Sequence, residues 1–431
     1  MKTLLRRIIN VANDRVTRVL FYDQTLKKGY ASLASFSKLF VFRRFLATLV
    51  AYPLSLCCWV LLIVVNRFTP VRVYRLNRPF RPGFASIYIE QLEPLCRELQ
   101  VRGNKGLLIF IDASQTTNHE LLKLYATHFN LYLDDRVAFV RTIIALIPKF
   151  GILNTFVKHS TYDTNWELPP AIKLATKEIE APLNVISQLE IESFKFVVLT
   201  HRSFLYDAKH HQNGASDLNR DTDISKAENA IRLIHESGLK IVRMGVDTDE
   251  LPDSLKFLPI IDLSGKFRTD AQDLWLSANC LFLWAINDNG AWHFAHKYNR
   301  PTLLTNSYTF AKGYQLTLFT FQTIWDERKN RKLSLTEMAA LKGVRGRASS
   351  MKEHGLTYVE NSPLELVTYV AEMLSYTIGE LKYSMQDLSL LSRYNETLVK
   401  SGYPPMLKNH SRPCISFIHA NQHLLDFAEK F

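Results

Sequence analysis

The chain has 431 residues, of which 47% are hydrophobic and 22% are charged, and both fractions are close to those of ordinary globular proteins. This composition excludes a disordered protein, a collagen-like fibre and a polytopic transporter, and the length predicts two or three domains. The formal net charge of +12 indicates an anionic partner, such as nucleic acid, acidic lipid or a nucleotide diphosphate.

The N-terminal segment, residues 1–68, joins a basic stretch to an apolar one. Its first 44 residues contain ten Lys or Arg and only two Asp, and residues 45–65 carry no charge. An uncharged run of this length is long enough for a membrane-spanning helix, but Pro53 interrupts it and favours a segment that enters one leaflet. A buried core helix is the third interpretation. We expect residues 1–68 to be a membrane-associated helical segment on an anionic membrane surface.

Residues 69–190 are predicted to form a first α/β domain. Residues 70–76 have the character of a strand, and residues 105–112 (KGLLIFID) resemble a fully buried parallel strand. Residues 87–99 and 118–132 are typical of helices.

Residues 191–375 show the same alternation more clearly. Apolar strands are predicted at 194–200, 239–244, 280–285 and 301–305. Between and after them, Ser225-x-x-Glu228, Thr269-x-x-Gln272 and Ser362-Pro363-x-Glu365 are typical helix starts, and Gly238 ends the first of these helices. The pattern predicts a doubly wound α/β domain, followed by a C-terminal helical extension at 376–431. Two such domains imply a cleft between them.

Candidate ligand-binding residues follow the predicted strands, because ligands of open parallel sheets bind beyond the carboxyl ends of the strands. His201 and Arg202 follow the first strand of this domain, Arg243 and Gly245 lie at the end of the second, and residues 287–290 (NDNG) follow the third. An arginine and a helix N-terminus at this edge suit a phosphate. The chain has neither GxGxxG nor a Walker loop, which disfavours a dinucleotide oxidoreductase and a P-loop NTPase.

Each candidate also has a plainer interpretation. Arginines at such positions form surface ion pairs more often than they bind ligands, and the glycines are equally typical of ordinary turns. Asp221 and Asp223 precede a predicted helix, where negative charge favours the dipole, and the five cysteines lack zinc spacing. We therefore expect no metal and no cofactor.

Several motifs resemble a family of bacterial two-domain (GT-B) glycosyltransferases associated with surface-polysaccharide genes. The similarity covers most of residues 60–375 and is strongest in the second half. It is carried by IVRMG at 241–245, IIDLSGKFRTDAQDLWLSANC at 260–280, the Asn289-Gly290 turn and RPTLLTN at 300–306. LTHRSFLY at 199–206, NRDTDIS at 219–225 and KNRKLSLTEM at 329–338 add to it.

The resemblance implies two Rossmann-like domains facing a cleft, the second of which binds the donor. It places the donor nucleotide and diphosphate at Arg202, Arg243, Gly245, Arg268, Asp270, Asn289 and Gly290. Where the family usually has Ser or Thr beside the turn glycine, this chain has Asp288-Asn289. An anionic Asp288 beside a diphosphate requires that its carboxylate faces away or is neutralised.

The sequence thus predicts a metal-independent glycosyltransferase at the cytoplasmic face of a bacterial inner membrane, with a nucleotide-sugar donor and a lipid-linked or polysaccharide acceptor. Candidates for the base that deprotonates the acceptor hydroxyl are Glu90, Asp112 and His119 from the first domain, and Glu90 is favoured because it follows the Gly83 loop. The alternative is a catalytically degenerate, membrane-associated subunit that binds glycan or protein. Nucleic acid is not expected as a partner, because the basic residues gather beside the apolar run and no RNA- or DNA-binding motif is present.

Overall fold

The chain divides into two compact units, Met1–His159 and Ser160–Phe431, which are described separately. The computed structural model describes residues 53, 57, 60, 61, 64, 71–75, 106–111, 118, 120, 132–133, 183–202, 222–246, 249–265, 268–310, 316–341, 348–403, 406 and 411–425.

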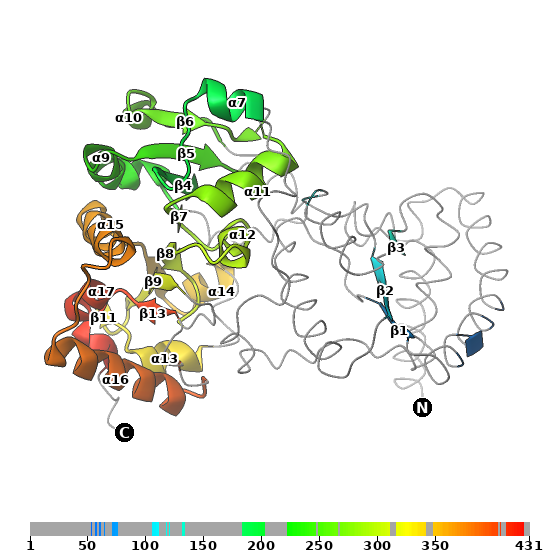
Figure 1. Cartoon of the computed structure of the whole chain (residues 1–431). Coiled ribbons are helices and arrows are strands. Elements are labelled where there is room, and N and C mark those ends of the chain that lie inside the picture. The colour runs from blue at the N-terminus through cyan, green and yellow to red at the C-terminus, as the bar shows by residue number, and fades with distance from the viewer. Residues whose placement is uncertain are drawn as a thin grey trace, which may run out of the picture. The chain divides into compact units, whose positions relative to one another are not determined.

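The described part of the first unit contains a parallel sheet with the order β1-β2-β3 (Figure 1). Its strands are β1 (Val71–Arg75), β2 (Gly106–Ile111) and β3 (Tyr132–Leu133). Val73 pairs with Leu108, and Phe110 pairs with Tyr132. The strands predicted at 70–76 and 105–112 are therefore confirmed.

The second unit contains a seven-stranded sheet in which every neighbouring pair is parallel, with the order β13-β9-β8-β7-β4-β5-β6. The strands are β4 (Phe196–Thr200), β5 (Lys240–Met244), β6 (Ile260–Asp262), β7 (Phe282–Ala285), β8 (Thr302–Ser307), β9 (Thr317–Phe321) and β13 (Arg412–Pro413). The predicted doubly wound α/β fold is confirmed for this unit.

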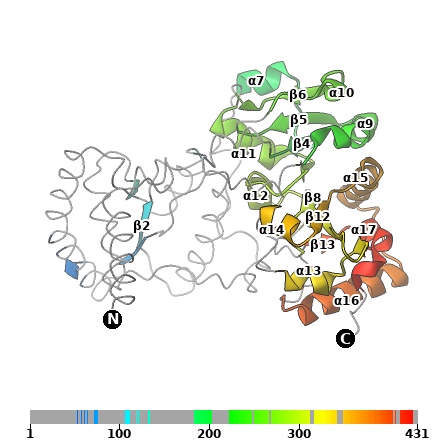
Figure 2. The ribbon, with the colours of Figure 1, turned by 180° about the vertical axis from the view of Figure 1, so that it is seen from behind.

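Helices cover both faces of this sheet. Figures 1 and 2 show α9 (Glu228–Glu236) and α15 (Pro363–Thr377) on one face, and α11 (Asp270–Asn279) and α12 (Trp292–Lys297) on the other. Because both faces are covered, the central strands β4 and β7 are buried along their whole length. Burial on both faces requires apolar residues at every position, which explains the continuous apolar sequences of these two strands.

Most helix starts agree with the sequence. Thr269 caps α11 and Ser362 caps α15, each in a complete capping box. The prediction for Ser225 was wrong: Asp223 is the cap, accepting a bond from the Ser225 N–H at 2.9 Å. It opens the 3-10 turn η7 (Ile224–Ala227), and α9 follows directly from that turn.

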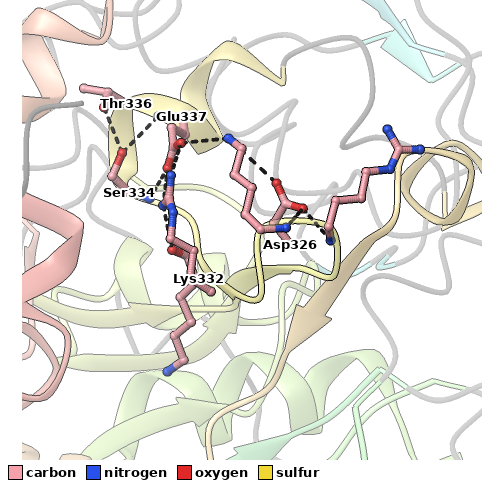
Figure 3. Close-up of polar contacts among 8 residues, drawn as sticks. Asp326, Lys332, Ser334, Thr336 and Glu337 are labelled. Atoms are coloured by element: carbon pink, nitrogen blue, oxygen red, sulfur yellow. Dashed lines mark hydrogen bonds and ion pairs between the residues drawn. The ribbon is translucent and has the colours of Figure 1, made fainter. Parts of the chain in front are cut away.

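A small antiparallel sheet with the order β11-β10-β12 extends beyond β9. Its strands are β10 (Thr323–Asp326), β11 (Arg331–Lys332) and β12 (Leu356–Val359). The β10–β11 hairpin is attached to α13 (Leu335–Ala340) through Glu337, which also completes the capping box of Ser334 (Figure 3). Sequence analysis did not foresee this sheet.

The remaining elements are α7 (Leu183–Gln188), α10 (Asp253–Lys256), α14 (Ala348–Glu353), α16 (Met385–Lys400), α17 (Ile415–Ala420) and η9 (Gln422–Leu425). Residues 376–431, predicted as a helical extension, also contribute β13, which pairs with Leu318 and Phe319 of β9. The C-terminal segment is therefore part of the sheet.

The apolar run at 45–65 is described at five positions, Pro53, Cys57, Val60, Leu61 and Val64, all with helical backbone and exposed side chains. Within the described residues, no helix is both long enough and apolar enough to cross a bilayer.

Candidate functional site

The strand order creates a topological switch point between β4 and β7. From β4 the chain proceeds to β5 and β6 on one side, and then returns to place β7, β8 and β9 on the other. The connections that leave β4 and β7 therefore diverge, and in such sheets the ligand crevice lies between those two carboxyl ends. Residues 201–202 and 286–290 occupy this position.

The loop after β7 is attached to β4 by side-chain amides. Asn289 Nδ2 donates to the Thr200 hydroxyl at 3.0 Å, and Asn289 Oδ1 accepts from the Ala291 N–H at 3.0 Å. Asn289 thus takes up a backbone donor just before α12, a helix of only six residues. Its contacts hold the Asn289-Gly290 turn against β4.

Asn287 connects the loop after β7 to the end of β4 by hydrogen bonds of its side-chain amide. Its Oδ1 accepts from the Arg202 N–H at 2.8 Å, and its Nδ2 donates to the Arg202 C=O at 3.0 Å and to the Thr222 hydroxyl at 3.2 Å. The side chain is fully buried. It joins both the end of β4 and the start of η7 to β7.

Asp288 turns away from β4 and towards β8. Its Oδ2 accepts from the Ser307 hydroxyl at 2.8 Å and from the Tyr308 N–H at 2.7 Å, and the residue is buried. The carboxylate is therefore hydrogen-bonded on the β8 side, which meets the requirement that it should not face a diphosphate between β4 and β7.

His201 is partly buried at the end of β4, and its ring is neutral. Its Nε2 lies 2.7 Å from the Thr222 C=O, which can only accept, so Nε2 carries the proton. Desolvation of the ring, together with the nearby Arg243 charge, lowers the pKa of His201 to about 4, against the opposing effect of the bond to Thr222. His201 Nδ1 is a buried acceptor with no hydrogen-bond partner among the described residues.

Arg243 and Gly245 lie on the β5 side of the edge. Arg243 is buried, and its Nη1 donates to Asp262 Oδ2 of β6 at 2.9 Å, while Nη2 donates to the Asp249 C=O at 2.7 Å. The Gly245 C=O accepts from the Gly265 N–H at 3.1 Å, so the segments that follow β5 and β6 stay in contact beyond the two strands. One end of the Arg243 guanidinium therefore joins β5 to β6, and the other holds the segment that follows β5.

Arg268 and Asp270 belong to the start of α11. Arg268 Nη2 lies 2.8 Å from Asp270 Oδ1, and Arg268 Nε donates to Asp273 Oδ2 at 2.6 Å. Burial raises the pKa of Asp273 to about 6, although the Arg268 charge opposes the shift. Two carboxylates thus offset the Arg268 charge.

The structure brings three of the predicted donor residues together at the switch point, namely Arg202, Asn289 and Gly290. The other four lie elsewhere. The β5–β6 side holds Arg243 and Gly245, and the start of α11 holds Arg268 and Asp270. The catalytic candidates Glu90, Asp112 and His119 lie outside the described residues. Among the described residues, no group of three or more His, Cys, Asp or Glu is arranged to hold a metal ion.

Sequence analysis assigned no role to Thr200 and Asn287, whose side chains hold the loops at the switch point, nor to Thr222, which accepts one bond from Asn287. The available signal was the amide-rich NDNG segment directly after a buried strand, since buried amides must find partners on a neighbouring element.

Comparison with known proteins finds no family model that matches the chain and no curated protein that matches it significantly. Solved structures give weak matches. E. coli ADP-heptose lps heptosyltransferase II is 13% identical, with 75% of this chain and 94% of that chain covered and a TM-score of 0.32. A glycosyl transferase of family 9 from Veillonella parvula is 12% identical, with coverage of 77% and 94% and a TM-score of 0.31. E. coli heptosyltransferase WaaC with ADP is 10% identical, with coverage of 58% and 91% and a TM-score of 0.31. Because all three TM-scores are low, the matches alone do not establish a shared fold.

Proposed function

We propose that this chain is a metal-independent glycosyltransferase of the GT-B type, which transfers a sugar from a nucleotide-sugar donor to a lipid-linked or surface-polysaccharide acceptor. One observation carries the proposal: Arg202, Asn289 and Gly290, three residues to which the sequence resemblance assigns the donor, meet at the β4–β7 switch point. A nucleotide is the ligand typical of this place in a doubly wound sheet.

The chemistry of the transfer fits these residues. When the bond between sugar and diphosphate breaks, negative charge develops on the departing phosphate, and a fixed arginine stabilises that charge. We assign this contact to Arg202. Arg243 lies on the β5–β6 side and Arg268 at the start of α11, away from the switch point, so we assign both a supporting role.

The acceptor side of the proposal rests on the first unit. Its three parallel strands support a second Rossmann-like domain, which we expect within residues 69–190 and whose strands lie in Met1–His159. A base for the acceptor hydroxyl would come from Glu90, Asp112 or His119, of which Asp112 directly follows β2 in the sequence.

We further propose that the N-terminal segment contacts the cytoplasmic face of a bacterial inner membrane. Pro53, Cys57, Val60, Leu61 and Val64 are spaced as residues on one side of a helix, and all are exposed. An exposed apolar stripe next to a basic segment suits an anionic lipid surface. Flotation with anionic liposomes should fall strongly when Leu61 and Val64 are both replaced by Glu, and unchanged flotation would contradict this part.

The central experiment is a thermal-shift panel of ADP-, UDP-, GDP-, CMP- and dTDP-sugars. We expect one nucleotide to raise the melting temperature, because a ligand that binds only the folded state stabilises it. Arg202→Ala should abolish the shift, whereas Arg232→Ala, which removes a charge from an exposed ion pair on α9, should keep it. No response of the folded protein to any nucleotide would overturn the proposal.

Product formation then separates the enzyme from a binding-only subunit. With the nucleotide identified, release of free nucleotide in the presence of membrane lipid extract should occur and should persist in EDTA. Binding without release would favour the degenerate subunit, and loss of activity in EDTA would contradict metal independence.

A further inference from the structure

The backbone hydrogen bonds between β4 and β7 end at Thr200 and Ile286, before either strand reaches its following loop. The last of these bonds runs from the Ile286 N–H to the Thr200 C=O at 3.0 Å. In a regular parallel ladder, the next bonds would join Arg202 N–H to Ile286 C=O, and Asp288 N–H to Arg202 C=O. Instead, the Ile286 C=O accepts from the Thr305 hydroxyl of β8 at 3.1 Å. β7 has therefore left β4 at this point.

The side-chain amide of Asn287 replaces the missing backbone partners. Its Oδ1 accepts from the Arg202 N–H at 2.8 Å and its Nδ2 donates to the Arg202 C=O at 3.0 Å, so both backbone groups of Arg202 are satisfied by one side chain. The remaining Nδ2 hydrogen reaches the Thr222 hydroxyl. Only an amide offers a donor and an acceptor side by side, and a carboxylate of the same shape can only accept.

We propose that Asn287 is a positioning residue for the donor diphosphate: it extends the sheet by one residue with its side chain and thereby sets the backbone of Arg202. This inference rests on the proposed function, in which Arg202 contacts the diphosphate. Fixing the backbone of Arg202 sets the direction of its Cα–Cβ bond, so the guanidinium reaches the anion with less freedom to lose on binding. Small errors in such positioning are costly.

The test is the affinity of the full chain for ADP, UDP, GDP, CDP and dTDP, measured by calorimetry, with the corresponding monophosphates as matched ligands. Asn287→Asp keeps the acceptor for the Arg202 N–H but removes both donors and adds a negative charge, so the uncharged Asn287→Ser is measured beside it and should lose affinity as well. We expect the diphosphate that binds best to lose about tenfold or more in affinity, and its monophosphate to lose less.

Two further variants separate positioning from a general loss of stability. Asn279→Asp changes another buried asparagine, which accepts from Ser193 and donates to Trp275 at the opposite edge of the sheet, and should leave affinity unchanged. Thr222→Val removes only the third contact of Asn287 and should also bind almost normally. If Thr222→Val weakens binding as much as Asn287→Asp, the inference is wrong.

A double-mutant cycle gives the decisive result. Because Asn287 is proposed to act through Arg202, Asn287→Asp should cause no further loss of diphosphate affinity in an Arg202→Ala background. Additive losses would overturn the inference but leave the proposed function intact, while a folded wild-type chain that binds no diphosphate would overturn both. If Asn287→Asp does not fold, the same cycle is run with Asn287→Ser, with the same interpretation.

Discussion

The Asp288 carboxylate and the Ser307 hydroxyl lie 2.8 Å apart at the ends of the neighbouring strands β7 and β8. The same carboxylate oxygen accepts from the Tyr308 N–H. Asn287 and Asn289 turn towards β4. Three consecutive residues thus alternate between the two neighbours of β7, so the switch point is fixed from both sides.

Removing the Asp288 carboxylate should destabilise the second unit. In Asp288→Ala, the Tyr308 N–H loses its buried acceptor, and we expect the free energy of unfolding to fall by roughly 2 kcal/mol. Ser307→Ala keeps the Asp288 bond to the Tyr308 N–H but removes the Ser307 hydroxyl from Asp288 and from Thr309, and it should cost roughly 1 kcal/mol. Urea denaturation measures both values, and an Asp288→Ala variant as stable as the wild type would contradict this account.

The strands of the second unit were predictable because strands buried on both faces need continuous apolar sequence, as residues 196–200 and 282–285 show. Their order in the sheet was not, because parallel strands pair without local turns. The Asn287–Arg202 contact joins residues 85 positions apart and exists only because β4 and β7 are neighbours. Sequence spacing carries no information about that.

Two smaller errors have local causes. Asp223 and Ser225 both suit an N-cap, and the pattern Ser225-x-x-Glu228 favoured the wrong one because η7 inserts a tighter turn before α9. β13 is two residues long and includes Pro413, so it lacks any alternating or apolar pattern. Its pairing with β9 depends on where the C-terminal segment packs, which its own sequence does not indicate.

His201 should make the protein less stable in mild acid. Its pKa is about 4 in the folded protein, against the ordinary value of 6.5 that an unfolded chain retains, so between these values only the unfolded chain binds the proton. As the pH falls from about 6.5 to about 4, wild-type stability should decline relative to His201→Gln by up to about 3 kcal/mol. Urea midpoints at successive pH values measure the difference, and parallel profiles would argue against a buried neutral ring.

The ion pairs of Glu337 with the β10–β11 hairpin should also lose their stabilising effect at low pH. Here the cause is a carboxylate that the folded protein stabilises in its charged form. Arg331 chiefly, with the Ser334 backbone and Lys329, lowers the pKa of Glu337 to about 2 from 4.5. Its stabilisation is therefore complete above about 4.5 and lost as the pH falls towards 2. Because Arg331 is half exposed, we expect Glu337→Gln to cost only about 1 kcal/mol at pH 7.

Salt and a matched variant test this assignment. High salt should reduce the difference between wild type and Glu337→Gln, because solvent-exposed ion pairs are screened. Glu327→Gln, in the same hairpin, alters a carboxylate that accepts from the exposed Thr357 hydroxyl, and it should change stability little. A Glu337→Gln effect that persists undiminished at low pH would show that the charge is not its cause.

Gly355 and Gly238 should differ in their tolerance of a side chain. Both have positive φ, +69° and +79°, so alanine at either position carries a backbone cost of about 1 kcal/mol. A Cβ at Gly238 meets nothing within 4 Å, whereas one at Gly355 lies 3.2 Å from Arg328 Nε. Arg328 also donates to the Glu353 C=O, so moving it costs a further contact. We expect Gly355→Ala to lower the unfolding free energy more than Gly238→Ala does, and Arg328→Ala to remove most of that excess in the double variant; equal losses for the two glycines would contradict the role of Arg328.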